Sequence, residues 1–309
     1  MSAPGLPWPT VATRLGVGGG PFGGLFTHVP EAEVVAAVER AWSLGIRLFD
    51  VAPFYGHGRA ERLVGGVLSQ LPRDQFALST KVGRVLRRDV RRTPSSFVDA
   101  DDAEPVFDFS AAGVYRSLTE SLERLGLDRV DVAYIHDPED HLDQALAEAL
   151  PSLEELRAEG LVGATGVGTN FAETLARFAR EATIDCALLA GRFTLLDRSG
   201  GDVALPLCAE RGIAVVVGGV FNSGLLADGT GTFDYAPAPS ERVAEAQRLA
   251  AICEQFDVSL SAAALQFPFT HPAVVSVVVG VRGPQEVEAN VAAFEKRIPP
   301  ELWERLAHD

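Results

Sequence analysis

The sequence has 309 residues, of which 47% are hydrophobic, so it can bury the core of one large α/β barrel or of two smaller domains. Its 27 basic and 42 acidic residues give a formal net charge of -15. This acidity argues against nucleic-acid and anionic-membrane partners, because both bind basic surfaces, and it is typical of a surface that keeps a protein soluble.

Targeting and redox features are sparse. Cys186, Cys208 and Cys253 lie far apart, with the spacing of neither a disulfide framework nor a zinc site. The first ten residues, MSAPGLPWPT, lack the basic and apolar segments of a signal peptide, and no run of about 18 apolar residues predicts a membrane span. These features predict a cytoplasmic protein, whereas its oligomeric state cannot be predicted from this pattern.

Short apolar segments rich in β-branched residues alternate with helical segments along the chain. The expected strands are residues 14–17, 46–50, 76–81, 130–136, 162–167, 184–189, 213–217 and 274–279. Helices are expected at about residues 30–44, 63–68, 110–125, 142–159, 171–180, 204–211, 242–256 and 284–294. Eight such βα units favour a closed (β/α)8 TIM barrel over a doubly wound open sheet, as one domain spanning residues 1–309.

Two long loops, residues 82–109 and 218–240, follow strand C-terminal ends and are therefore expected to cover a site there. Residues 18–23 fit the dinucleotide fingerprint G-x-G-x-x-G, but no helix opens after them, so we interpret them as a loop that lets another segment approach closely. His136 and His141 do not share a helical face, and no metal site is predicted. The acids between them are expected to lead into the next helix.

Four reactive side chains stand at or just beyond strand ends: Asp50, Tyr55, Lys81 and His136. Asp50 and Lys81 alone are also consistent with a structural salt bridge. Together with Tyr55 they make chemical sense, because a nearby ammonium lowers the cost of forming tyrosinate and a carboxylate holds that ammonium. A histidine beside them can bind the reacting oxygen. This set predicts proton transfer to or from an alcohol or carbonyl oxygen.

At these four residues the chain resembles the aldo-keto reductase family, over nearly its whole length. The resemblance implies a barrel that binds NAD(P)H at its C-terminal face without a Rossmann fold. It also implies three groups of cofactor contacts. They are Thr169 and Asn170 at the nicotinamide, then Asn222, Ser223 and Leu225 near the pyrophosphate, and Gly280, Arg282, Glu286 and Asn290 at the adenosine phosphate.

The chain also departs from the common family pattern. Ala190 stands where many members carry a glutamine beneath the nicotinamide, and Gly218 where many carry a stacking tyrosine, for which Phe221 is a candidate substitute. Glu286 stands where NADP-dependent members place an arginine. A carboxylate there accepts hydrogen bonds from a ribose 2′-hydroxyl but repels a 2′-phosphate, so NAD is slightly favoured over NADP.

Four short motifs resemble one branch of the family: APFYG at 52–56, IHDP at 135–138, RFTLL at 192–196 and FNSGLL at 221–226. That branch holds L-fucose, D-threo-aldose and L-galactose 1-dehydrogenases, with pyridoxal 4-dehydrogenase close by. It implies oxidation of a cyclic aldose at C1 to the lactone. A pyridoxal dehydrogenase, a broad aldehyde or ketone reductase and a cofactor-binding regulatory subunit are the alternatives. Candidate substrate contacts are Phe22, Phe54, Arg87 and Phe193, although plain packing explains the three phenylalanines equally well.

Overall fold

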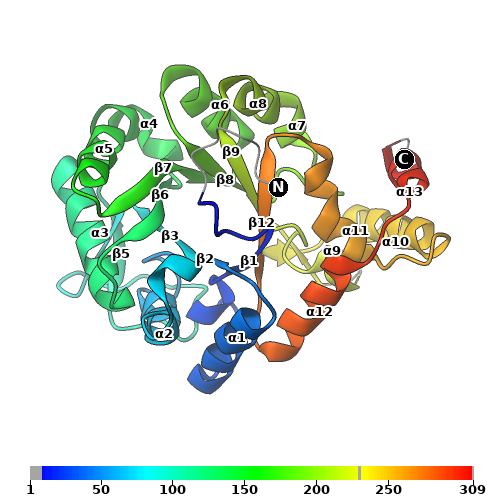
Figure 1. Cartoon of the computed structure of the whole chain (residues 1–309), viewed down its shortest axis with the longest axis horizontal. Coiled ribbons are helices and arrows are strands. Elements are labelled where there is room, and N and C mark those ends of the chain that lie inside the picture. The colour runs from blue at the N-terminus through cyan, green and yellow to red at the C-terminus, as the bar shows by residue number, and fades with distance from the viewer. Residues whose placement is uncertain (1–8, 229–230, 308–309) are drawn as a thin grey trace.

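Eight parallel strands form a closed barrel in the order β1-β12-β9-β8-β7-β6-β3-β2 (Figure 1). The computed structural model describes residues 9–228 and 231–307. The prediction about the first ten residues therefore lies largely outside the described part. The barrel strands are β1 (Leu15–Gly18), β2 (Leu48–Asp50), β3 (Ala77–Val82), β6 (Val130–His136), β7 (Val162–Thr169), β8 (Cys186–Ala190), β9 (Ala214–Gly218) and β12 (Val274–Gly280).

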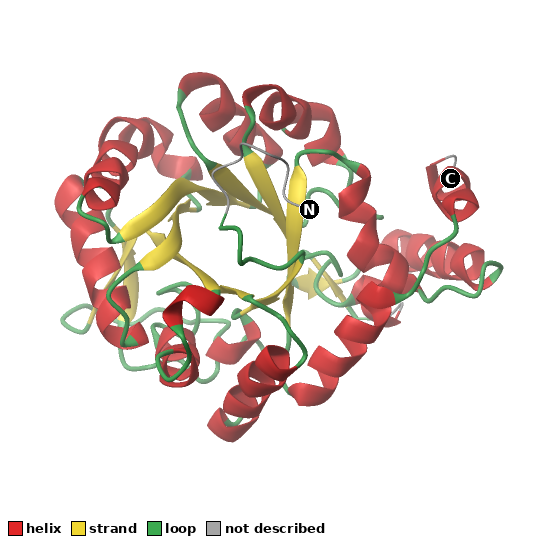
Figure 2. Ribbon diagram, in the orientation of Figure 1, coloured by secondary structure: helices red, strands yellow, loops and turns green. Residues whose placement is uncertain are grey.

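Helices surround the barrel on its outside, as Figure 2 shows. They are α1 (Glu31–Ser43), α2 (Arg59–Leu68), α3 (Ala111–Leu125), α4 (Leu142–Gln144), α5 (Leu150–Ala158), α6 (Ala172–Glu181), α7 (Ser199–Val203), α8 (Leu205–Arg211), α9 (Leu225–Asp228), α10 (Ser240–Glu254), α11 (Leu260–Gln266), α12 (Pro284–Glu295) and α13 (Pro300–Ala307). A π-helical segment, Ala145–Ala149, joins α4 to α5. The eight predicted strands and the barrel are thus confirmed.

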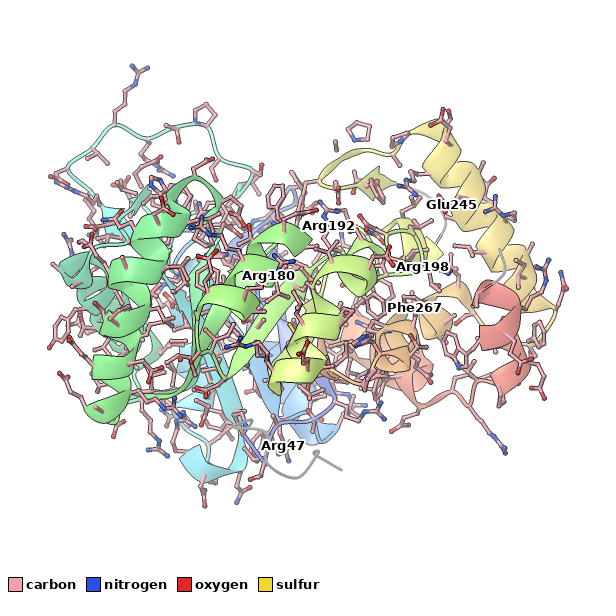
Figure 3. All side chains as sticks on the ribbon, turned by 90° about the horizontal axis from the view of Figure 1, so that it is seen from above. Arg47, Arg180, Arg192, Arg198, Glu245 and Phe267 are labelled. Carbon is pink, nitrogen blue, oxygen red and sulfur yellow. The ribbon has the colours of Figure 1, made fainter. Side chains whose placement is uncertain are left out.

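The two long loops contain structure that the sequence pattern did not predict. In the first, β4 (Arg84–Arg87) and β5 (Glu104–Phe107) form an antiparallel pair. In the second, the short strands β10 (Thr232–Phe233) and β11 (Ala236–Pro237) form another. Both rise at the end of the barrel opposite Arg47, which precedes β2 (Figure 3). The loops therefore stand over the C-terminal ends of the barrel strands.

Two apolar layers hold the strands in place. One lies between the strands and the surrounding helices, and the other fills the barrel with side chains such as Leu48, Val132 and Tyr134. Val11 and Ala12 pack against this inner layer, so the first described residues close the N-terminal end of the barrel. The opposite end is left for the site.

No helix within residues 9–228 and 231–307 is both long and apolar enough to span a bilayer. Over the same residues, no cluster of three or more histidine, cysteine and acidic side chains is arranged to hold a metal ion.

Candidate active site

Asp50 and Lys81 form a buried ion pair at the C-terminal ends of β2 and β3. The Lys81 Nζ lies 2.7 Å from Asp50 Oδ2 and 3.0 Å from the Val51 carbonyl oxygen, and the other Asp50 oxygen accepts from Ser79 Oγ at 2.7 Å. The Lys81 side chain is 1% exposed and that of Asp50 is 3% exposed. Burial acts to lower the pKa of Lys81, but the Asp50 carboxylate and the Tyr55 hydroxyl together outweigh it and raise that pKa. The lysine is therefore a fixed, permanently charged cation.

Tyr55 lies above this pair, in the loop between β2 and α2. The Lys81 ammonium is 4.5 Å from the centroid of its ring. Burial raises the pKa of the Tyr55 hydroxyl to about 12, whereas the charge of Lys81 acts in the opposite direction. Lys81 therefore reduces the cost of forming tyrosinate at this position, against the effect of burial.

His136 ends β6, and its ring lies edge-on to Tyr55 with the centroids 6.0 Å apart. Burial, with the positive charges of Arg84 and Lys81, lowers the pKa of His136 well below its usual range. The imidazole is therefore neutral, and its buried Nδ1 has no hydrogen-bond partner among the described residues. The structure thus brings all four predicted catalytic residues to one end of the barrel.

The glycine-rich loop fixes the position of Tyr55. A Cβ on Gly23 would lie 2.3 Å from the Gly56 backbone nitrogen and 2.5 Å from the Tyr55 carbonyl carbon. Gly56 has a φ of +62°, which favours glycine. The first loop therefore lets the Tyr55 segment approach closely, as the sequence predicted, and no dinucleotide-binding helix begins there: Pro21–Gly23 is a single 3-10 turn.

Arg84 and Asp137 form a second ion pair beside His136, which sequence reasoning missed. The Arg84 Nη2 donates to Asp137 Oδ2 at 2.8 Å, and the same oxygen lies 3.5 Å from His136 Nε2. The prediction that Asp137 leads into a helix is therefore incomplete, since the 3-10 turn begins only at Glu139. The four residues of β4, Arg-Val-Leu-Arg, do not alternate between apolar and polar side chains, so the sequence holds no signal that could have located Arg84.

Arg87 occupies a different environment from Arg84. Residues 84 and 87 lie on opposite faces of β4, because side chains alternate along a strand. Arg87 donates to Asp89 at an exposed position, where its side chain is 42% exposed. Of the two arginines, only Arg84 therefore lies on the face of the hairpin that is turned toward His136.

The three candidate phenylalanines are also separated. Phe54 contacts the site, with its ring centroid 6.1 Å from that of His136. Phe22 is fully buried, and Phe193 lies 5.1 Å from Phe267, which Figure 3 labels. Packing thus accounts for Phe22 and Phe193. Phe97, from the long loop, was not predicted, and it packs against both Phe54 and Tyr55 at centroid distances of 5.2 and 6.3 Å.

The segment after β9 has the features of a ligand cradle. Asn222 and Ser223 have φ of +45° and +62°, and Asn222 is 2% exposed with its Oδ1 buried and unpartnered among the described residues. Leu225 is fully buried, and Phe221 packs against the core. A buried acceptor without a partner can receive a hydrogen bond from a bound ligand, so Asn222 is a candidate contact for a group that carries a donor.

Small residues lie side by side on the two strands before that loop. Ala190 of β8 pairs in register with Gly218 of β9. These are the two positions where the sequence carries small residues in place of the expected larger ones. A Cβ on Gly218 would lie 3.5 Å from the Cβ of Ala190, so the two residues pack closely against each other. Nearby, Thr169 donates to the Glu139 carboxylate, and the Asn170 carbonyl accepts from Arg192 Nε at 2.8 Å.

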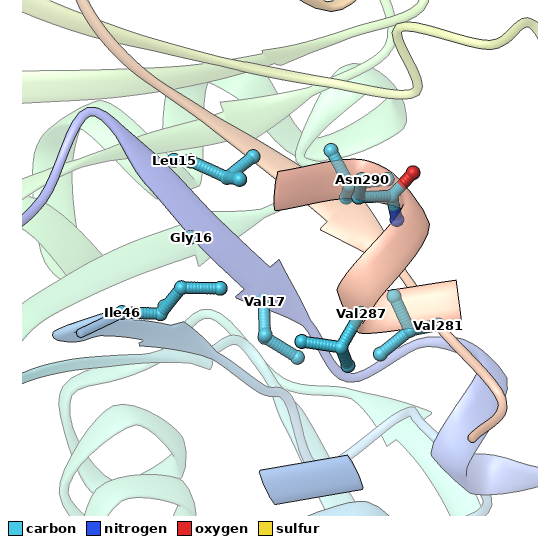
Figure 4. Close-up of a pocket in the computed structure, with 8 residues that line it drawn as sticks. Leu15, Gly16, Val17, Ile46, Val281, Val287 and Asn290 are labelled. Carbon is cyan, nitrogen blue, oxygen red and sulfur yellow. The ribbon is translucent and has the colours of Figure 1, made fainter. Parts of the chain in front are cut away.

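Arg282 and Glu286 bind one another at the start of α12. The Arg282 Nη2 lies 3.0 Å from Glu286 Oε1, and the Arg282 backbone N–H donates to Glu286 Oε2 at 2.9 Å. Gly280 precedes them at the exposed end of β12. Asn290 lies one turn further, at a small cavity of ≈ 10 Å³ between α12 and β1 (Figure 4). This cavity has room for about one water molecule.

Comparison with known proteins agrees with this geometry. A model of the Aldo/keto reductase family matches residues 14–308. A D-threo-aldose 1-dehydrogenase from a Pseudomonas species is 44% identical, covering 95% of this chain and 92% of that protein. A pyridoxal 4-dehydrogenase from Microbacterium luteolum is 42% identical, covering 95% and 93%. A solved glycerol dehydrogenase from Gluconobacter oxydans superposes with a TM-score of 0.77 at 22% identity, covering 96% and 91%, which shows a shared fold.

Proposed function

Because the chain belongs to the aldo-keto reductase family and is an oxidoreductase, we propose that it oxidises a cyclic aldose at C1 to the lactone. One observation carries the proposal: the Lys81 cation, Tyr55 and a neutral His136 lie next to one another at one end of the barrel. The proposed substrates are aldoses of the L-fucose, L-galactose and D-arabinose type, with C1 presented as a hemiacetal.

Tyr55 acts as the base in this reaction. Its phenolate removes the proton from the C1 hydroxyl, and Lys81 favours the phenolate through its positive charge. Asp50 does not touch the substrate; it holds Lys81 in place. His136 is neutral and donates one hydrogen bond to the reacting oxygen, which helps to select the anomer.

Nicotinamide cofactors serve this family, and a bound NAD(P)⁺ supplies the hydride acceptor. Thr169 and Asn170 would hold its nicotinamide end, and the 221–225 segment its pyrophosphate. The unpartnered Asn222 Oδ1 is an acceptor, so it would take a hydrogen bond from a hydroxyl or amide group of the cofactor and not from the pyrophosphate. Glu286 already neutralises Arg282, so the pair offers little net positive charge to a 2′-phosphate. This supports the use of NAD⁺ at least as well as NADP⁺.

Pyridoxal is a second candidate substrate, favoured by the 42% identical pyridoxal 4-dehydrogenase. A regulatory role without catalysis is disfavoured, because a cofactor sensor needs no lysine-assisted tyrosine. A broad aldehyde reductase differs from both candidates in its response to simple aldehydes with NADPH, which it would reduce rapidly.

The test follows NADH or NADPH absorbance with NAD⁺ or NADP⁺ and a panel of aldoses, pyridoxal and simple aldehydes. Tyr55→Phe should lower kcat by at least about 100-fold while cofactor affinity stays near that of the wild type, because only proton transfer is removed. Tyr115→Phe, at a 52% exposed tyrosine on α3, is the matched control and should have no effect. Turnover by Tyr55→Phe near the wild-type rate, or a wild type that is inert with every aldose, would reject the proposal.

A further inference from the structure

Arg84 is held in an aromatic clamp at the wall of the site. Its guanidinium carbon lies 4.2 Å from the ring centroid of Phe54 and 4.2 Å from that of Phe107, one ring from each of two different loops. The side chain is 13% exposed, and its buried Nε has no hydrogen-bond partner among the described residues. A guanidinium stacked in this way loses much of its freedom to move, so it presents a fixed charge to its neighbour.

That neighbour is Asp137, immediately after His136. Only one of its two carboxylate oxygens, Oδ2, accepts a hydrogen bond from the described residues, namely from Arg84, and the same oxygen lies 3.5 Å from His136 Nε2. No residue in the described part of the chain donates to Oδ1, and the side chain remains 24% exposed. The φ of Asp137 is +45°, an uncommon conformation for a residue other than glycine, and its backbone N–H is held by the Gly168 carbonyl oxygen at 2.9 Å. The carboxylate is thus fixed beside the catalytic histidine with one acceptor free.

The distances define what this acceptor can meet. His136 Nδ1 is buried, so we assign Nε2 as the nitrogen that donates to the reacting oxygen in the proposed reaction, and Asp137 Oδ2 lies 3.5 Å from it. An oxygen on the carbon next to the reacting carbon lies about one hydrogen-bond length from the reacting oxygen. A substrate held by Tyr55 and His136 therefore brings such a hydroxyl to the carboxylate.

We propose that the Arg84–Asp137 pair is a specificity element that recognises a hydroxyl group on the carbon adjacent to the reacting carbon. Asp137 accepts a hydrogen bond from that hydroxyl, and Arg84 acts through Asp137 as a positioning residue. This inference rests on the proposed function, because it names the feature of the sugar that the same site selects.

The test compares substrates that differ only in this hydroxyl: the most active aldose of the panel against its 2-deoxy counterpart. The wild type should favour the hydroxylated sugar in kcat/KM, and Asp137→Ala should reduce that preference by roughly 10- to 100-fold, as expected for a hydrogen bond to a charged acceptor. Arg84→Met should reduce it in the same direction. Arg87→Met, on the opposite face of the same strand, is the matched control and should leave the preference unchanged.

The ratio separates recognition from general damage, because the intrinsic reactivity of the two sugars is the same in every variant. An equal loss on both sugars in Asp137→Ala would show that Asp137 acts only through His136, and it would overturn the inference. If Asp137→Ala does not fold, Asp137→Asn keeps the side-chain volume, and an unchanged ratio in that folded variant would overturn the inference too.

A second pair of substrates keeps this test independent of the sugar proposal. The reductions of 2-hydroxypropanal and propanal with NADH or NADPH differ in the same adjacent hydroxyl. A wild-type preference for 2-hydroxypropanal that Asp137→Ala abolishes would support the inference even if no aldose is oxidised. If aldoses are oxidised but neither substrate pair shows a preference that depends on Asp137, the proposed function stands and this inference fails.

Discussion

Lys81→Met should both destabilise the protein and stop catalysis, because it leaves the Asp50 carboxylate buried without its cation. The two groups are 2.7 Å apart and at most 3% exposed. Removing one partner of such a pair costs about 3–5 kcal/mol. At about 2.1 cal/mol/K per residue, the unfolding entropy of 309 residues is about 0.65 kcal/mol/K, so the Tm should fall by about 5–8 °C. Calorimetry and reversible urea denaturation measure both quantities.

The chain contains a matched control for this change. Lys296, the only other lysine in the sequence, lies 2.9 Å from Asp257, but these side chains are 43% and 98% exposed. Lys296→Met removes the same group at nearly the same distance, yet it should cost less than about 1 kcal/mol, because water screens an exposed pair. The two pairs differ chiefly in burial, although Lys81 also donates to the Val51 carbonyl oxygen.

A double variant identifies the source of the loss. Asp50→Asn combined with Lys81→Met leaves no buried charge, so it should recover at least half of the stability that Lys81→Met alone loses. If the two substitutions instead add, so that the double variant is less stable than either single variant by the full sum, an unpaired charge is not the cause. The reasoning about this pair would then be refuted.

Three further outcomes are expected. In the oxidative direction, the logarithm of kcat/KM should rise with unit slope against pH above pH 7. The reason is that only the deprotonated Tyr55 removes a proton, and burial raises its pKa to about 12 in the free enzyme. A plateau reached below pH 8 would contradict this. Glu286→Ala should raise the NADP⁺/NAD⁺ ratio of kcat/KM by about tenfold, because it frees its arginine partner; an unchanged ratio removes this residue from cofactor selection. Gly23→Ala should lower both Tm and kcat, since its Cβ would overlap the Gly56 backbone, whereas Gly20→Ala has open space and should be neutral in both assays.

One physical property of parallel sheets explains why the strand pattern predicted both the barrel and the grouping of the four catalytic candidates at one end of it. The C-terminal ends of parallel strands lie at the same edge of a sheet, so Asp50 and Lys81, each at or near the end of an apolar segment, had to be neighbours. The local sequence also marked Gly23 correctly, because a loop so rich in glycine permits a backbone approach that side chains forbid.

The strand pattern could not predict which way the side chains of the long loops point. The β4–β5 hairpin is short, polar and flanked by charges, and it has none of the apolar alternation that identifies a strand. Without its register, Arg84 and Arg87 look equivalent, although they point to opposite faces. Phe22 and Phe193 were ambiguous for a related reason: an aromatic residue near a site has the same sequence signature whether it lines the site or supports it.

The pairing of β1 with β12 has a consequence for the synthesis of the chain. Leu15 pairs with Val277, so one edge of the first strand, β1, stays unpaired until the last strand, β12, has been made. Once β9 has emerged from the ribosome, and until residues 274–280 follow, an open sheet has β1 and β9 as its two free edges, with unpaired N–H and C=O groups along each. Both edges can pair with other chains during this interval, and the insertion of β12 removes them together.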